Sequence, residues 1–317
     1  MSTGISLDHI REAAAVIDPV FRDTPQYVSD AISGDYGVTT ILKVECVNPI
    51  RSFKGRGTDY LLHRMGPHSG GYVCASAGNF GQGMAFAARK RSYRMTVFAA
   101  TNANEFKVER MRALGAEVVL SGNDFDAAKE VAIRHAEETG SFYVEDGVLS
   151  AIAEGAGTIA LELTQTSEAL DAVLVPLGNG ALINGIGTWL RRASPHTRVI
   201  GVCAAGAPSM EISWRAGKPI NTGSTSTIAD GIAVRIPVPE ALALMRETVD
   251  DVTLVTDEQI LKAMQLLLVE EGFAAEPAGA AGLAALANMC DDLAGQRVAI
   301  VITGGNVTEE QLRRCVG

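Results

Sequence analysis

At residues 48–57 the chain reads Asn-Pro-Ile-Arg-Ser-Phe-Lys-Gly-Arg-Gly. A run typical of a strand precedes this segment at residues 39–47, and a run typical of a helix follows it at residues 58–65. The Asn-Pro pair ends the strand, and Ser52 is suited to cap the new helix. Lys54 is therefore expected to project from the first turn of a helix.

A lysine in this position is disposed to act as a nucleophile. The positive end of a helix destabilises a second positive charge, and Arg51 and Arg56 are expected to add to that effect. The neutral amine that results can attack a carbonyl group. A solvated lysine in a basic turn is the ordinary alternative, so the interpretation of Lys54 depends on finding a binding site around it.

The composition narrows the class of protein. Of the 317 residues, 47% are hydrophobic and 20% charged, which is enough for a large core and two lobes. A net charge of -10 argues against a nucleic-acid groove or an anionic membrane surface. The sequence shows neither a secretory signal pattern nor an apolar run long enough to span a bilayer. We therefore expect a cytoplasmic enzyme that acts on a small molecule.

Cysteine usage gives no sign of a disulfide framework or a zinc site. The cysteines are odd in number and scattered, and no CxxC pair occurs. They are Cys46, Cys74, Cys203, Cys290 and Cys315.

Short apolar segments alternate with amphipathic segments from residue 72 to residue 303. The runs at 72–75, 172–177 and 297–303 are typical of buried strands. This alternation predicts parallel sheets with helices on both faces. Residues 27–36 are expected to form a turn region.

A glycine turn follows the buried strand at 172–177. Residues 178–182 read Gly-Asn-Gly-Ala-Leu and open a helix. A strand, a turn of small residues and a helix aim free backbone N–H groups at an anion. A dinucleotide fingerprint fits poorly, because the spacing is not G-x-G-x-x-G and no acidic residue ends the strand at 198–204.

A second segment of small residues follows the strand at 72–75. Residues 76–83 read Ser-Ala-Gly-Asn-Phe-Gly-Gln-Gly. Its N–H and hydroxyl donors are suited to hold a carboxylate. The alternative is an ordinary helix entry.

Together these segments resemble the signatures of the pyridoxal-phosphate (PLP) enzymes of fold type II, in the branch of threonine and serine dehydratases and serine racemases. The lysine segment is similar to S-F-K-x-R-G, residues 76–83 to S-[SA]-G-N-H-[GA]-Q-G, and residues 227–232 to T-[IL]-A-D-G-[IV]. The resemblance runs from about residue 25 to residue 306. It implies an α/β fold of two lobes, each a mostly parallel sheet flanked by helices, with PLP in the cleft between them. The implied large domain comprises residues 1–65 and 147–317, and the small domain residues 66–146.

The resemblance implies a PLP site. Lys54 would bind the cofactor covalently, beside Phe53, and Asn79 would hydrogen-bond its ring hydroxyl oxygen. The glycine turn, for which the family usually has G-G-G-G-L, would grip the phosphate with Gly178, Asn179, Gly180, Ala181 and Leu182.

Three further residues are implied around the cofactor ring. Gly231 would lie over the ring, Glu276 near it, and Thr303 against the pyridine nitrogen. A hydroxyl group cannot stabilise a pyridinium as a carboxylate would, so the cofactor is a weaker electron sink. Loss of a β-leaving group is then favoured over transamination. The alternatives are a strand-end cap for Thr303 and a solvated side chain for Glu276.

The substrate carboxylate would bind to the loop that follows the strand at 72–75. Ala77 stands where the racemases of this family have a second catalytic serine, which favours elimination over racemisation. Phe80 replaces the usual histidine, and an apolar wall there favours an apolar or aromatic β-substituent. The implied substrate-binding residues are Ser76, Ala77, Gly78, Asn79, Phe80 and Gly81.

The function implied is a PLP-dependent ammonia-lyase (dehydratase) of β-hydroxy amino acids such as L-threonine or L-serine. Lys54 would remove the Cα proton, the hydroxyl would leave protonated from the phosphate side as proposed for relatives, and the product would hydrolyse to a 2-oxo acid and ammonia. The alternatives are a dehydratase for a bulkier substrate such as phenylserine, an amino-acid racemase, a β-replacement synthase, or a non-catalytic protein that senses PLP or an amino acid.

The resemblance also implies a homodimer. No metal is expected, because Cys203 and Ser209 stand where relatives with a divalent cation have a glutamate and an aspartate. The chain ends soon after Thr303, so the regulatory domain of biosynthetic threonine dehydratases is not expected.

Overall fold

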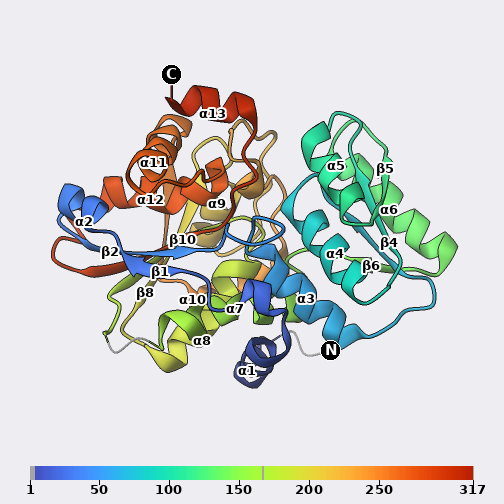
Figure 1. Ribbon diagram of the computed structural model, residues 1–317, viewed down its shortest axis with the longest axis horizontal. Coiled ribbons are helices and arrows are strands. Elements are labelled where there is room, and N and C mark those ends of the chain that lie inside the picture. Colours follow the sequence, from blue (N-terminus) through green and yellow to red (C-terminus); the bar gives the residue numbers. More distant parts are fainter. Residues whose placement is uncertain (1–3, 166–167, 317) are drawn as a thin grey trace.

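Two sheets are formed by the described residues of the computed structural model, 4–165 and 168–316. Figure 1 shows one on each side of the molecule, with α3 between them. The larger sheet has the order β1 (Gln26–Val28), β2 (Thr39–Val44), β10 (Arg297–Ile302), β7 (Ala172–Pro176), β8 (Arg198–Ala204) and β9 (Asp251–Val255). The smaller has the order β5 (Glu117–Leu120), β4 (Met95–Ala99), β3 (Tyr72–Ala75) and β6 (Phe142–Val144).

All strand pairs are parallel except β1 with β2, which confirms the predicted α/β class with mostly parallel sheets. The connecting helices are α1 (Leu7–Val16), η1 (Pro19–Phe21), α2 (Asp30–Tyr36), α3 (Lys54–Met65), α4 (Asn79–Lys90), α5 (Glu105–Ala113), α6 (Phe125–Thr139), α7 (Ser150–Leu163), α8 (Ala181–Ala193), α9 (Ser209–Ala216), η2 (Asp230–Ile232), α10 (Pro239–Thr248), α11 (Asp257–Glu270), α12 (Pro277–Met289) and α13 (Glu309–Val316).

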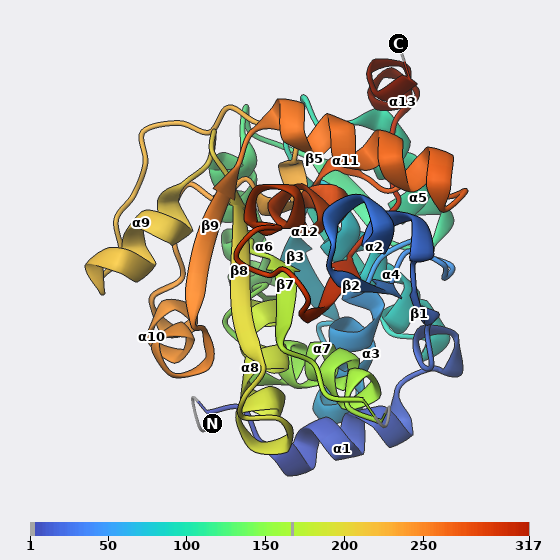
Figure 2. The same ribbon diagram turned by 90° about the vertical axis from the view of Figure 1, so that its left-hand side faces the viewer.

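The larger sheet is covered on both faces, and Figure 2 shows its strands side by side. Alternate residues of a strand point to opposite faces. In β10, Val298, Ile300 and Ile302 pack into a core with α11 and α12, whereas Ala299 and Val301 pack into another with α7 and α8. Burial on both faces explains why β10 reads as one continuous apolar run.

The smaller sheet follows the same rule. Tyr72 and Cys74 of β3 pack into a core with α3 and α4, whereas Val73 and Ala75 pack against α6. The strands of this sheet all lie between residues 72 and 144. The domain boundaries given above stay a prediction.

Helix α3 begins at Lys54, before the run typical of a helix at residues 58–65, and glycines let both α3 and α4 pack closely. A Cβ on Gly57 would lie 2.5 Å from the carbonyl oxygen of Ile152 in α7, and one on Gly83 would lie 2.7 Å from the hydroxyl of Thr58 in α3. Glycine has a low helix propensity, but at these positions it allows the helices to pack closely against their neighbours. Lys54 consequently lies in the first turn of α3, as predicted.

The prediction of a turn region at residues 27–36 is wrong. The segment contains the end of edge strand β1 and helix α2, whose N-cap Ser29 accepts a hydrogen bond from the N–H of Ile32. A three-residue strand and a seven-residue helix are too short to show a period.

Within residues 4–165 and 168–316, no helix has the length and apolar character needed to cross a membrane.

Candidate active site

A cavity of about 960 Å³ lies at the carboxyl ends of strands from both sheets. Ligand sites of parallel α/β proteins form at this edge. The cavity brings together residues that are far apart in the sequence: the segments after β2, β3, β6, β7 and β10 all contribute to its wall. Of the predicted site residues it is lined by Phe53, Lys54, Ser76, Ala77, Gly78, Asn79, Phe80, Gly178, Asn179, Gly180, Ala181, Leu182, Gly231, Glu276 and Thr303.

Gly81 is the predicted residue that does not line the cavity. Its N–H donates to the Ser76 hydroxyl at 2.9 Å, and a Cβ there would lie 2.4 Å from the sulfur of Met111. Gly81 thus holds the loop through Ser76 and packs against Met111 outside the cavity. Its contact with substrate stays a prediction.

Lys54 points into this cavity from the start of α3. Its N–H donates to the Ser52 hydroxyl at 3.3 Å, so Ser52 assists the helix start although Phe53 occupies the N-cap position. Its Nζ lies 4.9 Å from the Phe53 ring centroid and 5.8 Å from that of Phe80. The amine is therefore held between two aromatic rings and the carboxylate of Asp146, whose Oδ2 is 2.5 Å away.

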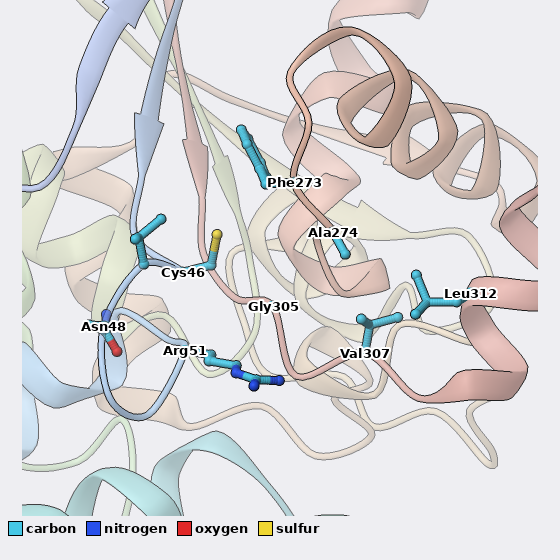
Figure 3. A pocket seen from close by; sticks show the side chains of 9 residues that line it. Cys46, Asn48, Arg51, Phe273, Ala274, Gly305, Val307 and Leu312 are labelled. Atoms are coloured by element: carbon cyan, nitrogen blue, oxygen red, sulfur yellow. The ribbon is translucent and has the colours of Figure 1, made fainter.

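Arg51 and Arg56, which were expected to act on Lys54, contact other groups. Arg56 is fully buried and bonds the carboxylates of Glu45 and Glu162 at 2.6–2.9 Å, so its charge is neutralised. Arg51 lines a second cavity of about 500 Å³ with Gly305 and Val307, as Figure 3 shows. The expectation of a cationic environment for Lys54 is thus wrong, because the charge that contacts the amine is negative.

Asn79 joins the two sheets through its amide. Its Nδ2 donates to Glu276 Oε1 at 2.6 Å, and its Oδ1 accepts from Asn306 Nδ2 at 2.8 Å. The second hydrogen of Nδ2 stays available for an oxygen in the cavity. A Cβ on Gly304 would lie 2.1 Å from Glu276 Oε1, so a larger residue at this position would displace the carboxylate.

Glu276 titrates near neutrality. Burial raises the pKa of its carboxyl to about 7, and this effect outweighs the opposing charge of Lys107; the charge of Asp230 raises the pKa further. The hydrogen bonds from Asn79 and Asn306 also oppose the shift. A carboxyl with a raised pKa stabilises the fold most below its unfolded pKa, and that contribution is lost as the pH rises through the folded pKa.

We therefore expect a Glu276→Gln apoprotein to gain stability relative to the wild type as the pH rises from 5 to 8. Between pH 5 and pH 8, the difference in the free energy of unfolding between Glu276→Gln and the wild type should change by up to about 3 kcal/mol. Urea denaturation at several pH values measures it. Glu310→Gln, at an exposed position on α13, is the control. A Glu276→Gln difference that stays constant with pH would contradict the raised pKa.

The glycine turn has the geometry of an anion cradle. Gly180 is the N-cap of α8 with a φ of 93°, a conformation that glycine adopts without strain. The first turn of α8 then directs its N–H groups toward the cavity. A Cβ on Gly178 would lie 2.9 Å from the carbonyl oxygen of Gly231, so the turn packs closely under that segment. These residues fit a phosphate group.

Thr303 lines the cavity directly after β10. Its side chain is 4% exposed, and its carbonyl oxygen accepts from the N–H of Phe53 at 3.0 Å. The Thr303 segment is thereby tied to the start of α3.

Lys107, Asp146 and Asp230 are three of the charged residues of the cavity wall that the sequence did not indicate as site residues. Lys107 of α5 is ion-paired with Asp230 of η2, across the cavity from one sheet region to the other. Asp146 follows β6, and β6 pairs in parallel with β3. The available signal was the acidic pair Glu145-Asp146, which follows a short apolar run. The contact of Asp146 with Lys54 appears only in the fold.

Comparison with known proteins defines the class. Residues 17–304 match the family model described as pyridoxal-phosphate dependent enzyme. This match covers most of the chain, and the protein belongs to that family. The predictions of a fold type II enzyme and of PLP as its cofactor are confirmed.

The chain is similar to threonine ammonia-lyases in sequence and to threonine deaminase and serine racemase in structure. It is 36% identical to L-threonine ammonia-lyase of Thermotoga maritima over 98% of this chain and 78% of that protein. It is 38% identical to the Geobacter sulfurreducens L-threonine ammonia-lyase over 94% and 75%. The processed form of threonine deaminase isoform 2 from Solanum lycopersicum superposes with a TM-score of 0.91, at 28% identity over 99% and 89% of the two chains. Maize serine racemase superposes with a TM-score of 0.92, at 30% identity over 98% and 96%.

Proposed function

We propose that this protein is a PLP-dependent ammonia-lyase that converts a β-hydroxy amino acid, L-threonine or L-serine, into a 2-oxo acid and ammonia. One observation carries the proposal: a lysine amine, a loop of N–H and hydroxyl donors and a helix N-terminus converge on one cavity. The amine is Lys54, the loop is residues 76–80, and the helix is α8. The names of the similar proteins support the same reaction class.

Residues 178–182 would hold the phosphate of PLP, and Thr303 and Asn79 would hydrogen-bond its ring nitrogen and its ring hydroxyl oxygen. Bound PLP supplies an electron sink for the Cα–H bond of the substrate. Ser76 and Gly78 hold the substrate carboxylate, and Lys54 takes the Cα proton. Loss of the β-hydroxyl as water then gives a product that hydrolyses to the oxo acid.

The site favours elimination over racemisation, because Ala77 supplies no acid on the face opposite to Lys54. The cytoplasmic location, the homodimer and the division into domains 1–65 with 147–317 and 66–146 are parts of this proposal. They are tested by fractionation, by light scattering and by limited proteolysis.

A bulkier substrate is the second candidate, and Phe80 is the observation that favours it. Its ring is 6% exposed, lines the cavity and lies 5.8 Å from the Lys54 amine. An apolar wall at this distance is suited to an aromatic β-substituent.

We expect the purified PLP enzyme to release 2-oxo acid and ammonia from L-threonine or L-serine. L-threo-phenylserine, assayed in parallel, tests the second candidate. A larger kcat/KM for phenylserine would assign the aromatic substrate. Release of no oxo acid from any of the three, with a D-amino acid formed instead, would assign a racemase and overturn the proposal.

A further inference from the structure

Asp146 is an ionisable residue of the cavity for which the predicted mechanism has no task. It follows β6 and contacts the Lys54 amine through Oδ2 at 2.5 Å. Its side chain is 15% exposed. Its other oxygen, Oδ1, is buried and has no hydrogen-bond partner among the residues that the structure describes. A buried carboxylate oxygen without a partner is costly, so this atom has unused capacity to hold a proton or accept a hydrogen bond.

The other charged residues of the cavity wall are hydrogen-bonded, ion-paired or exposed. Glu276 bonds Asn79, and Asp124 caps α6 by accepting from the N–H of Ala127. Glu240 is exposed at the start of α10. Three ion pairs account for further charged side chains: Lys107 with Asp230, Lys129 with Glu145, and Arg235 with Asp126.

Two neutral groups lie near Asp146. Burial raises the pKa of the Cys74 thiol, and the charge of Asp146 adds to the effect, so Cys74 stays protonated. Burial also raises the pKa of the Tyr143 hydroxyl. Lys54 is therefore the cation that Asp146 faces within the described residues.

We propose that Asp146 is the acid–base partner of Lys54 and that this pair protonates the departing β-hydroxyl. The proposal rests on the proposed ammonia-lyase function. Lys54 Nζ takes the Cα proton, and the electron pair of that bond forms the Cα–Cβ double bond. The Cβ–O bond breaks, its pair goes to oxygen, and the oxygen takes one proton from the Lys54–Asp146 pair and leaves as water. The pair gains one proton and gives one up, so it ends as it began.

The contact between Lys54 and Asp146 assists both the uptake of the Cα proton and the delivery of a proton to the leaving hydroxyl. A carboxylate at hydrogen-bond distance stabilises the ammonium group that forms when Lys54 takes a proton. At 2.5 Å the same proton can pass to Oδ2. The carboxyl group then holds a proton that a leaving hydroxyl requires, without a donor from the phosphate side.

The test compares two leaving groups in Asp146→Asn, which keeps the size of the side chain. Hydroxide from L-serine needs a proton to leave, whereas chloride from β-chloro-L-alanine does not. We expect kcat/KM for L-serine to fall about 10²–10⁴-fold in the holoenzyme. That for β-chloro-L-alanine should fall by no more than about tenfold, because this substrate loses only the effect of Asp146 on the Cα proton step. Glu145→Gln is the matched control, because Glu145 is the neighbouring carboxylate but bonds Lys129. It should change neither value by more than about threefold.

A spectroscopic measurement tests the contact independently of turnover. PLP bound to a lysine absorbs visible light, and the band changes when the linking nitrogen loses its proton. Without the negative charge of Asp146, the midpoint of that change should move down by about 1–2 pH units in Asp146→Asn. Asp146→Ser serves as a second variant, and Glu145→Gln should leave the midpoint in place.

Equal loss with both substrates would overturn the proposal, since Asp146 would then act on the Cα proton alone. An unchanged band midpoint would overturn it as well. If the wild-type enzyme released no oxo acid from either substrate, the proposed lyase function would fail, and the band titration would still decide whether Asp146 acts on Lys54.

Discussion

A Lys54→Ala protein is expected to lose at least about 10⁴-fold in the rate of 2-oxo acid formation, together with the visible absorption band of the PLP-bound protein. Lys54 lines the main cavity between the donor loop after β3 and the N-terminus of α8. Its amine is proposed both to bind the cofactor and to take the Cα proton. The other lysines of the described wall are Lys107 of α5 and Lys129 of α6, which pair with Asp230 and Glu145.

The measurement is oxo acid release after reconstitution with PLP, with the spectrum recorded on the same sample. Lys54→Arg is the informative control, since it keeps a positive charge for Asp146 but has no neutral amine at working pH. It should be as inactive as Lys54→Ala. If Lys54→Ala kept a rate within about tenfold of the wild type, Lys54 would not be the base, and the proposed mechanism would fail.

The sequence predicted the elements around the site well where each signal was local. The runs at Tyr72–Ala75 and Arg198–Ala204 are strands with those bounds, because each is an apolar run bounded by turn residues. Segments governed by distant packing were less predictable. Gly55, for example, faces the ring of Phe21, where a Cβ would lie 2.3 Å from the nearest ring carbon, and no local pattern shows that a helix will use glycine in this way.

The same distinction applies to the site. Resemblance placed the glycine turn, Asn79 and Thr303 at one cavity, because each motif is a short segment. The contact of Asn79 with Glu276 joins residues 197 positions apart, and that of Lys54 with Asp146 joins residues 92 positions apart. Such pairs depend on how the two sheets meet. The sequence indicated Asn79 and Lys54 as site residues, and the fold shows which side chains they contact. Arg56 shows the limit of predicting contacts from sequence neighbours. Its charge was expected to act on Lys54, but the side chain is buried and pairs with Glu45 and Glu162.

Removal of the buried charge of Arg56 should strongly lower the stability of the protein. Arg56 is 0% exposed and bonds Glu45 through Nε at 2.7 Å and Glu162 through Nη1 at 2.6 Å. Lys43 bonds Glu162 at 2.5 Å, so two cations balance two carboxylates in the core. Without Arg56, two carboxylates would be left with one cation, and an uncompensated buried charge costs about 3–5 kcal/mol.

We therefore expect Arg56→Met to lower the free energy of unfolding by about 3–5 kcal/mol, a large share of the 5–15 kcal/mol that is typical of a whole protein. Urea denaturation of the apoprotein measures the change. If Arg56→Met does not fold, Arg56→Lys keeps the charge but loses the bidentate bonds, and a loss of about 1–3 kcal/mol is expected. The control is Arg112→Met on the surface of α5, where the exposed pair with Glu109 is worth about 0–1 kcal/mol.

The pH dependence gives a second check on this cluster. Burial by itself would raise the pKa of Glu162, but the hydrogen bonds and charges of Arg56 and Lys43 outweigh it, so the pKa lies below its ordinary value. A lowered pKa stabilises the fold above the unfolded pKa, and that contribution is lost as the pH falls through the folded pKa. The gap in stability between wild type and Arg56→Met should therefore be full at pH 7 and shrink below pH 4.5. A gap under about 1 kcal/mol at pH 7 would show that the core tolerates the unpaired carboxylates.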